Sequence, residues 1–230
     1  MILIFLACFN LVQGQDSLRH KVTFPAYVIS GGLMTTGLYL EGGGRKESFR
    51  DWVRERHEVS TTGLDDFLQH SPIVMHYALD LATGKTKQQI ARSTRHLLVS
   101  QTFTIGTSLL LKSIVNTTRP NNGRLSFPSG HTAYSFASAT VLFHSYKDEN
   151  FALAVSGYVP AIVVGAYRIL KDKHWVSDVA FGAGMGMLFT HLSYQLNIWD
   201  SATVKVGSDK SNVNLRLAGT ADGAGLVLTF

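Results

Sequence analysis

Long uncharged segments alternate with shorter polar ones along the chain, and this pattern predicts a helical protein. After residue 15, five segments of 15 or more residues lack charged side chains: 22–40, 96–111, 132–146, 151–167 and 179–199. The three longest approach the roughly 20 residues that a membrane-spanning helix needs. Buried helices of a bundle in water would look the same, and a mean hydropathy of +0.10 fits both. We predict an all-α fold, a helical bundle that is embedded in a membrane.

Residues 41–94 are polar, which predicts loops and amphipathic helices in contact with water. Within this region, Leu64–Leu68 could open a helix with Asp65 and Asp66 in its first turn, where the helix dipole favours acidic side chains. We interpret these two aspartates as structural.

The two ends of the chain differ from its middle. Residues 1–15 are an apolar run that ends at small Gly14, as in a secretory signal peptide, but no Lys or Arg precedes the run. A short membrane anchor or a wrongly assigned start codon are the alternatives.

Near the other end of the chain, residues 212–217 alternate apolar and polar side chains, and 225–230 are rich in strand formers. With Asp222-Gly223 as a turn signal between them, they predict a β-hairpin. The expected organisation is therefore a signal or anchor at 1–15, a helical domain at 16–200 and a hairpin tail at 201–230.

The composition narrows the classes of partner. The net charge is +5 and the pI about 9.3, while charged residues make up 16% of the chain and hydrophobic residues 45%. No run of five basic residues occurs, so nucleic acid is the least favoured partner. Positive charge on such an apolar chain favours an anionic membrane or an anionic substrate. The single cysteine, Cys8, excludes a disulfide within the chain.

Lys112 and Arg119 form the first of three clusters of cationic and imidazole residues. They are seven residues apart, so they share one face if their helix extends that far, and Pro120 then ends it. A solvated or snorkelling pair is the alternative interpretation of this cluster taken alone. Arg124 and Ser126, in the loop that follows, could contact a head group or be a solvated part of the loop.

The second cluster is Pro128-Ser129-Gly130-His131, which precedes an uncharged, helix-compatible segment from Thr132 onward. Ser129 can cap this helix, and Gly130 lets a ligand approach the backbone closely. The free amides of the first turn attract an anion. His131 would then lie beside that anion, where it can donate a proton. A helix cap followed by an incidental histidine is the alternative.

The third cluster contains Arg168, His174 and Asp178. The last two are four residues apart, which places them on one face of a helix, where the carboxylate can hold one imidazole nitrogen and leave the other to attack. Arg168 adds a planar guanidinium that can bind two phosphate oxygens. A structural His–Asp pair is the alternative when this cluster is considered alone.

Together the three clusters meet the needs of phosphoryl transfer. Lys112, Arg119, Arg168 and the amides near Gly130 can stabilise the charge on the transferred group. His174 can act as the nucleophile and His131 as the acid that protonates the leaving oxygen. No carboxylate-rich metal site accompanies these residues, so we expect no metal and no cofactor, and activity that persists in a chelator.

The order and spacing of these motifs over residues 112–178 resemble the type 2 phosphatidic acid phosphatase and vanadium haloperoxidase superfamily. The resemblance implies an all-helical core, a phosphohistidine intermediate on His174, and a leaving-group acid at His131. It also implies a set of phosphate-binding residues: Lys112, Arg119, Ser129, Gly130 and Arg168. Tyr167 stands where the family usually has a serine, a difference that we expect to affect substrate preference.

The chain also resembles exported members of this family from Bacteroidetes, some of which remove phosphates from lipid A. This resemblance implies a phosphorylated lipid substrate, such as lipid A, phosphatidic acid or undecaprenyl pyrophosphate, and an active site in the cell envelope that faces the periplasm. The alternatives are a soluble periplasmic acid phosphatase of broad specificity, a vanadate-dependent haloperoxidase, and a non-catalytic phosphate-binding membrane protein.

Overall fold

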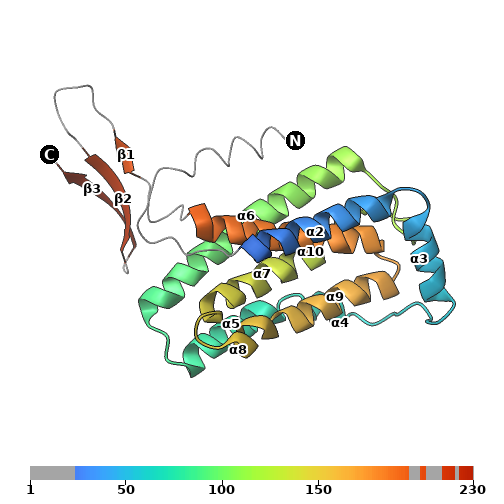
Figure 1. The fold of residues 1–230 in the computed structure, drawn as a ribbon, viewed down its shortest axis with the longest axis horizontal. Coiled ribbons are helices and arrows are strands. Elements are labelled where there is room, and N and C mark those ends of the chain that lie inside the picture. Colours follow the sequence, from blue (N-terminus) through green and yellow to red (C-terminus); the bar gives the residue numbers. More distant parts are fainter. Residues whose placement is uncertain (1–23, 197–202, 206–213, 221–222, 230) are drawn as a thin grey trace. The chain divides into compact units, whose positions relative to one another are not determined.

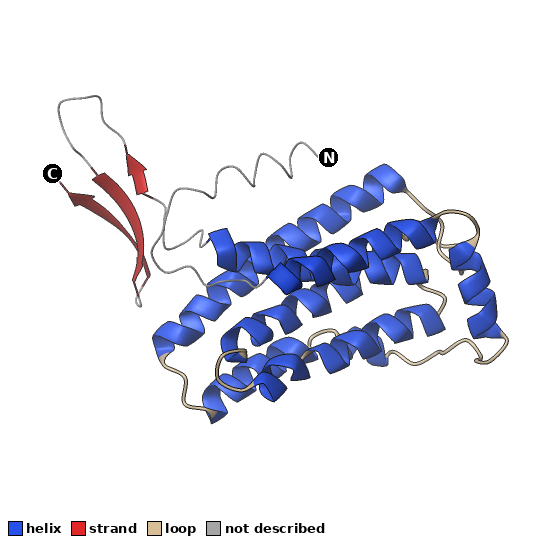
Figure 2. Ribbon diagram, viewed as in Figure 1, coloured by secondary structure: helices blue, strands red, loops and turns tan. Residues whose placement is uncertain are grey.

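The computed structural model describes residues 24–196, 203–205, 214–220 and 223–229. The expected signal or anchor at 1–15 lies outside them. Nine helices occur in this part of the chain (Figures 1 and 2). They are α2 (Phe24–Glu41), α3 (Arg45–Arg54), α4 (Leu64–Leu68), α5 (Ser71–Ala82), α6 (Lys87–Val115), α7 (Gly130–Tyr146), α8 (Phe151–Ser156), α9 (Tyr158–Leu170) and α10 (Val176–Leu196). The predicted all-α bundle is confirmed.

Helix α7 lies at the centre of the compact unit formed by residues 24–191 and packs against α5, α6, α8 and α9 (Figure 1). Many of its buried side chains are small, and Ala133, Ala137 and Ala139 are fully buried. Helix α10 approaches α7 closely at Gly186, where an added Cβ atom would lie 2.2 Å from the Ala133 carbonyl oxygen. Small residues at these crossings let the helix backbones come together, as is common for helices in membranes.

Several helix boundaries differ from the sequence prediction. The segment expected at 96–111 begins earlier, because Thr86 and Gln89 form a capping box at the start of α6. The segment 151–167 is divided into α8 and α9. In the region expected to face water, α5 instead packs against α7 and buries His76 and Asp80.

Two helical stretches in the described residues are long and apolar enough to cross a membrane. They are 87–115 and 151–170, and only 22% and 33% of their most apolar windows are buried within the protein. Large apolar side chains therefore remain exposed on these helices. Examples are Leu98, Phe103, Leu109, Leu110, Ile114, Phe151, Val159 and Ile162.

The C-terminal residues belong to a separate unit. In it, β2 (Asn214–Thr220) pairs with β3 (Gly223–Thr229) in antiparallel register, with Leu217 opposite Leu226. These strands overlap the segments for which the sequence predicts a hairpin; β2 begins and ends later than expected, and β3 begins earlier. A short strand that was not expected, β1 (Thr203–Lys205), pairs with the other side of β2.

Candidate active site

His174 and Asp178 are in contact, as their spacing predicts, but they do not share a helical face. His174 lies just before α10, whereas Asp178 is in the first turn of that helix. The Nδ1 atom of His174 is 3.3 Å from Oδ2 of Asp178, and both side chains are buried. Because the carboxylate can only accept, Nδ1 carries the proton of the contact and Nε2 keeps its lone pair.

Asp178 is itself held by two further donors to the same oxygen. The backbone amide of Trp175 donates to Oδ2 over 2.9 Å, which is half of a capping box at the start of α10. The hydroxyl of Ser126 donates to it over 2.5 Å. Ser126 is fully buried, so it is neither in a solvated loop nor free to contact a head group. Its observed role is to orient the carboxylate that holds His174.

The surroundings of His174 keep its imidazole neutral. Burial lowers the pKa of His174 to about 4, and the charges of Lys112 and Arg168 act in the same direction, whereas Asp178 opposes them. At pH 7 the ring is therefore uncharged, and the lone pair of its Nε2 atom is free to attack an electrophile.

Lys112 lies on helix α6, whereas Arg119 lies in the loop that follows it. Helix α6 ends at Val115 and Asn116 takes a left-handed conformation, so Arg119 lies in the following loop and not on the helix face shared with Lys112. The Lys112 ammonium donates to the carbonyl oxygens of Leu125 and Ser126, at 2.8 and 3.1 Å. It therefore fixes the loop that carries Ser126.

Arg119 keeps much of its donor capacity. Its backbone amide donates to the Gly123 carbonyl oxygen over 2.7 Å, which closes the loop, and its buried Nε atom has no hydrogen-bond partner. Burial lowers the pKa of Arg119, and repulsion by Arg168 adds to this effect. A partly buried cation that lies close to another cation and has an unpaired donor is typical of an anion-binding site.

Arg168 comes from the last turn of α9 and is paired with Asp65 and Asp66, whose first-turn position predicts a structural role. Its Nη1 atom donates to Oδ2 of Asp65 over 2.6 Å and lies 3.4 Å from Oδ1 of Asp66. Lys171 donates to the other oxygen of Asp65 over 2.6 Å. Burial raises the pKa of Asp65, but the hydrogen bonds and charges of Lys171 and Arg168 outweigh it and hold this pKa below its ordinary value. Arg168 Nε is buried without a partner.

The second cluster lies at the start of α7. His131 is partly exposed, and its Nε2 atom is 3.1 Å from Oδ1 of Asp66. Burial and the charge of Arg168 lower the pKa of His131, whereas Asp66 opposes them. Ser129 is the N-cap residue of α7, but its hydroxyl bonds to the Thr132 hydroxyl over 2.9 Å and not to a backbone amide. The expected side-chain cap is therefore wrong. The helix starts at Gly130, earlier than predicted.

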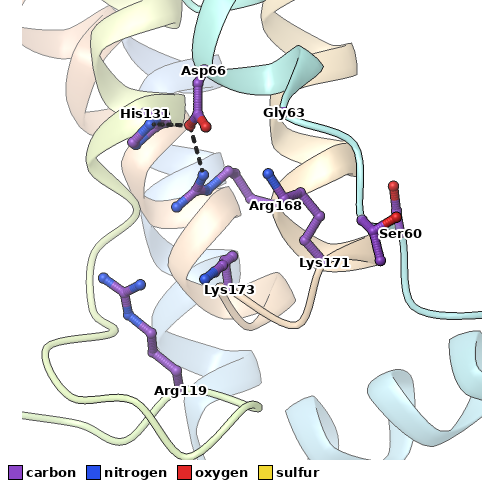
Figure 3. A pocket seen from close by; sticks show the side chains of 9 residues that line it. Ser60, Gly63, Asp66, Arg119, His131, Arg168, Lys171 and Lys173 are labelled. Atoms are coloured by element: carbon purple, nitrogen blue, oxygen red, sulfur yellow. Dashed lines mark hydrogen bonds and ion pairs between the residues drawn. The ribbon is translucent and has the colours of Figure 1, made fainter.

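A cavity of about 600 Å³ opens beside His131, Asp66 and Arg168 (Figure 3). His174, Lys112, Ser129 and Gly130 are not among the residues that line it. Its lining combines four cations with one carboxylate and one imidazole. The lining residues are Ser60, Thr61, Gly63, Asp66, Arg119, His131, Arg168, Lys171 and Lys173. A strongly positive cavity of this size fits an anionic head group better than a metal ion. Among the described residues, no group of three or more His, Cys, Asp or Glu side chains could hold a metal.

Three residues of this region were missed as functional candidates. Asp65, Asp66 and Lys171 surround Arg168, yet the two aspartates lie about a hundred positions before it in the chain. The sequence does contain one relevant signal, because three cations gathered in one site need counter-charges from elsewhere in the fold.

Part of the chain matches a known protein family. Residues 121–201 match the sequence profile of the PAP2 superfamily, the type 2 phosphatidic acid phosphatases. The predicted resemblance to this superfamily is confirmed. The PAP2 match contains the second and third clusters, whereas Lys112 and Arg119 precede it.

A lipid A phosphatase is among the relatives of this chain. The chain is 38% identical over 96 residues to the lipid A 1-phosphatase of Porphyromonas gingivalis, a region that covers 38% of this chain. The chain spans only 22% of the length of that relative.

Two solved structures are also similar. LpxE of Aquifex aeolicus is 25% identical, with a TM-score of 0.47 over 64% of this chain and 92% of that one. A transmembrane PAP2-type phosphatidylglycerolphosphate phosphatase of Bacillus subtilis is 16% identical, with a TM-score of 0.38 over 86% and 95%.

Proposed function

We propose that this protein is a metal-independent phosphatase that hydrolyses phosphate monoesters of membrane lipids through a phosphohistidine intermediate on His174. The observation that carries the proposal is the state of His174. It is buried and neutral, its Nδ1 atom faces Asp178, and the cations Lys112 and Arg168 are close enough to lower its pKa. A neutral imidazole held by a carboxylate next to buried cations is suited to attack a phosphoryl group.

The reaction would proceed in two steps. Nε2 of His174 attacks the phosphorus atom, the bond to the ester oxygen breaks, and His131 gives its proton to that oxygen as the alcohol leaves. His131 then removes a proton from water, whose oxygen attacks the phosphorus, and the P–N bond breaks to release phosphate and neutral His174. Throughout, Arg119 and Arg168 balance the charge on the phosphoryl oxygens, and their unpaired Nε atoms are donors for this task.

The outer surface of the helices supports a lipid as substrate. Helix α6 and the stretch 151–170 expose large apolar side chains, as a protein in contact with lipid acyl chains would. The named relative acts on lipid A, so a lipid A-type substrate is our first choice, ahead of phosphatidic acid and undecaprenyl pyrophosphate. We propose that the site faces the periplasm of a bacterial cell envelope.

Phosphate release from pure protein tests this proposal. The protein in detergent with EDTA is assayed on lipid A, phosphatidic acid and nitrophenyl phosphate, beside a His174→Ala variant. We expect EDTA-resistant release that requires His174 and favours a lipid. Equal rates on nitrophenyl phosphate would replace the lipid assignment by a phosphatase of broad specificity. Equal rates for the variant and the wild type on every substrate would refute catalysis at His174.

A further inference from the structure

Asp66 lies inside the proposed active site, between two groups of the catalytic machinery. One atom of its side chain, Oδ1, is 3.1 Å from Nε2 of His131 and 3.4 Å from Nη1 of Arg168 (Figure 3). Because a carboxylate oxygen only accepts, His131 Nε2 must point its proton at this atom, and Arg168 points an N–H group at it too. Two donors of the site thus converge on one negatively charged oxygen.

The same two donors have other partners during the proposed reaction. The proton of His131 must reach the ester oxygen, and the guanidinium of Arg168 must face the phosphoryl oxygens. A substrate oxygen therefore needs the place that Oδ1 of Asp66 occupies. The substrate oxygen and Oδ1 of Asp66 cannot both lie there, because two negatively charged oxygens so close together repel each other.

Asp65, the neighbour of Asp66, differs from it in burial and in hydrogen bonding. Its side chain is fully buried, and each of its oxygens accepts a bond of 2.6 Å, one from Arg168 and one from Lys171. Asp66 has a side chain that is 54% exposed on the cavity wall, and its contact with Arg168 is long. Asp65 is therefore a fixed support, whereas Asp66 can swing away at small cost.

We propose that Asp66 is a positioning residue that holds the place of a substrate oxygen between His131 and Arg168 in the free enzyme and leaves it when the phosphate enters. This inference rests on the proposed function of His131 and Arg168. In the free enzyme, Asp66 keeps the proton on Nε2 of His131 and keeps Arg168 pointed at the cavity, so both donors are already aligned when the substrate arrives.

Two consequences follow for an Asp66→Asn variant, which has nearly the same shape but no charge. Phosphate no longer competes with a carboxylate, so it should bind more tightly, by about fivefold for a half-exposed ion pair. In the free enzyme, the charged groups that face His131 are Asp66 and Asp65 from α4 and Arg168 from α9. Removing the charge of Asp66 lowers the pKa of His131 and moves the alkaline limb of kcat/KM to lower pH, by about one unit.

In Asp66→Asn, the alkaline limb of the plot of kcat against pH should move much less than the alkaline limb of the plot of kcat/KM. In the substrate complex the phosphate takes the place of the carboxylate, so His131 faces a negative charge in both variants. A residue that only supported the fold would lower kcat without this difference between the two pH profiles.

The test combines calorimetric titration with inorganic phosphate and pH profiles on phosphatidic acid, for full-length protein in detergent. The variants are Asp66→Asn, Asp66→Glu, which keeps the charge and should bind phosphate as the wild type does, and Asp148→Asn, which removes an exposed charge beside Lys147. Asp148→Asn should leave both measurements unchanged.

Phosphate binding by Asp66→Asn that is equal to or weaker than that of the wild type would overturn the proposal, as would an alkaline limb of kcat/KM that does not move. If the wild-type protein releases no phosphate in a His174-dependent way, the proposed phosphatase function fails. The calorimetric comparison then still decides whether Asp66 competes with phosphate.

Discussion

Asp65 offers the largest effect of a single substitution that the structure predicts outside the reacting groups. In Asp65→Ala, Arg168 and Lys171 each lose a charge-assisted hydrogen bond of 2.6 Å to a fully buried carboxylate. Arg168 is then left nearly buried with Arg119 close enough to repel it. Removing one partner of a buried ion pair costs about 3 to 5 kcal/mol.

The corresponding fall in Tm is about 6 to 20 °C, since 1 kcal/mol shifts a protein of this size by about 2 to 4 °C. Thermal unfolding in detergent at pH 7 and at pH 5 measures it. The pKa of Asp65 lies below its ordinary value in the folded protein, so its contribution is fully present above that ordinary value and is lost only as the pH falls through the lower folded pKa. The fall in Tm should therefore be the same at both pH values.

Asp148→Ala is the matched control, because it removes a carboxylate whose side chain is 72% exposed and whose partner is Lys147. Its Tm should change by less than about 2 °C. If Asp65→Ala unfolds at the temperature of this control, the ion pairs of Asp65 do not stabilise the protein and the reasoning is wrong.

Three further predictions concern catalysis and packing. Ser126→Ala loses the hydrogen bond that orients the carboxylate beside His174, so kcat should fall by about tenfold or more with little change in KM; a change in KM alone would contradict this. Catalysis needs neutral His174, which exists above its pKa of about 4, and protonated His131, which exists below its pKa, a value lower than the ordinary 6.5. A plot of kcat/KM against pH should therefore peak between these two pKa values. A maximum above about pH 8 would refute the assignment. Gly186→Ala would push a methyl group to 2.2 Å from a carbonyl oxygen of α7 and should lower the unfolding free energy by about 1 to 3 kcal/mol. Gly106→Ala, at an open position on a helix, should not lower it. Equal Tm values for the two variants would contradict the tight crossing of α10 and α7.

The part of the site that could be predicted from the sequence is the part set by local chain geometry. His174 and Asp178 are only four residues apart, so their contact follows from almost any compact backbone. The helical segments were predictable for a similar reason, because uncharged runs of this length must bury or embed themselves.

Helix ends and long-range partners could not be predicted in this way. Arg119 leaves the helix because Asn116 adopts a left-handed conformation, a choice that hydrophobic periodicity does not record. Asp65 and Asp66 resemble ordinary first-turn acidic residues, and only the packing of α4 against α9 brings them to Arg168. The burial of Ser126 could not be predicted either, because nothing local indicates that Lys112 ties this loop to the site.

The central claim is that a phosphoryl group is transferred to His174, and trapping that intermediate tests it most directly. The protein in detergent with EDTA is mixed with a ³²P-labelled lipid phosphate and quenched with alkali within the first turnover. The account predicts a label that is stable to alkali, released by acid, located on the peptide that contains His174 and missing from His174→Ala. Turnover without such a label, or a label that persists in His174→Ala, would contradict it.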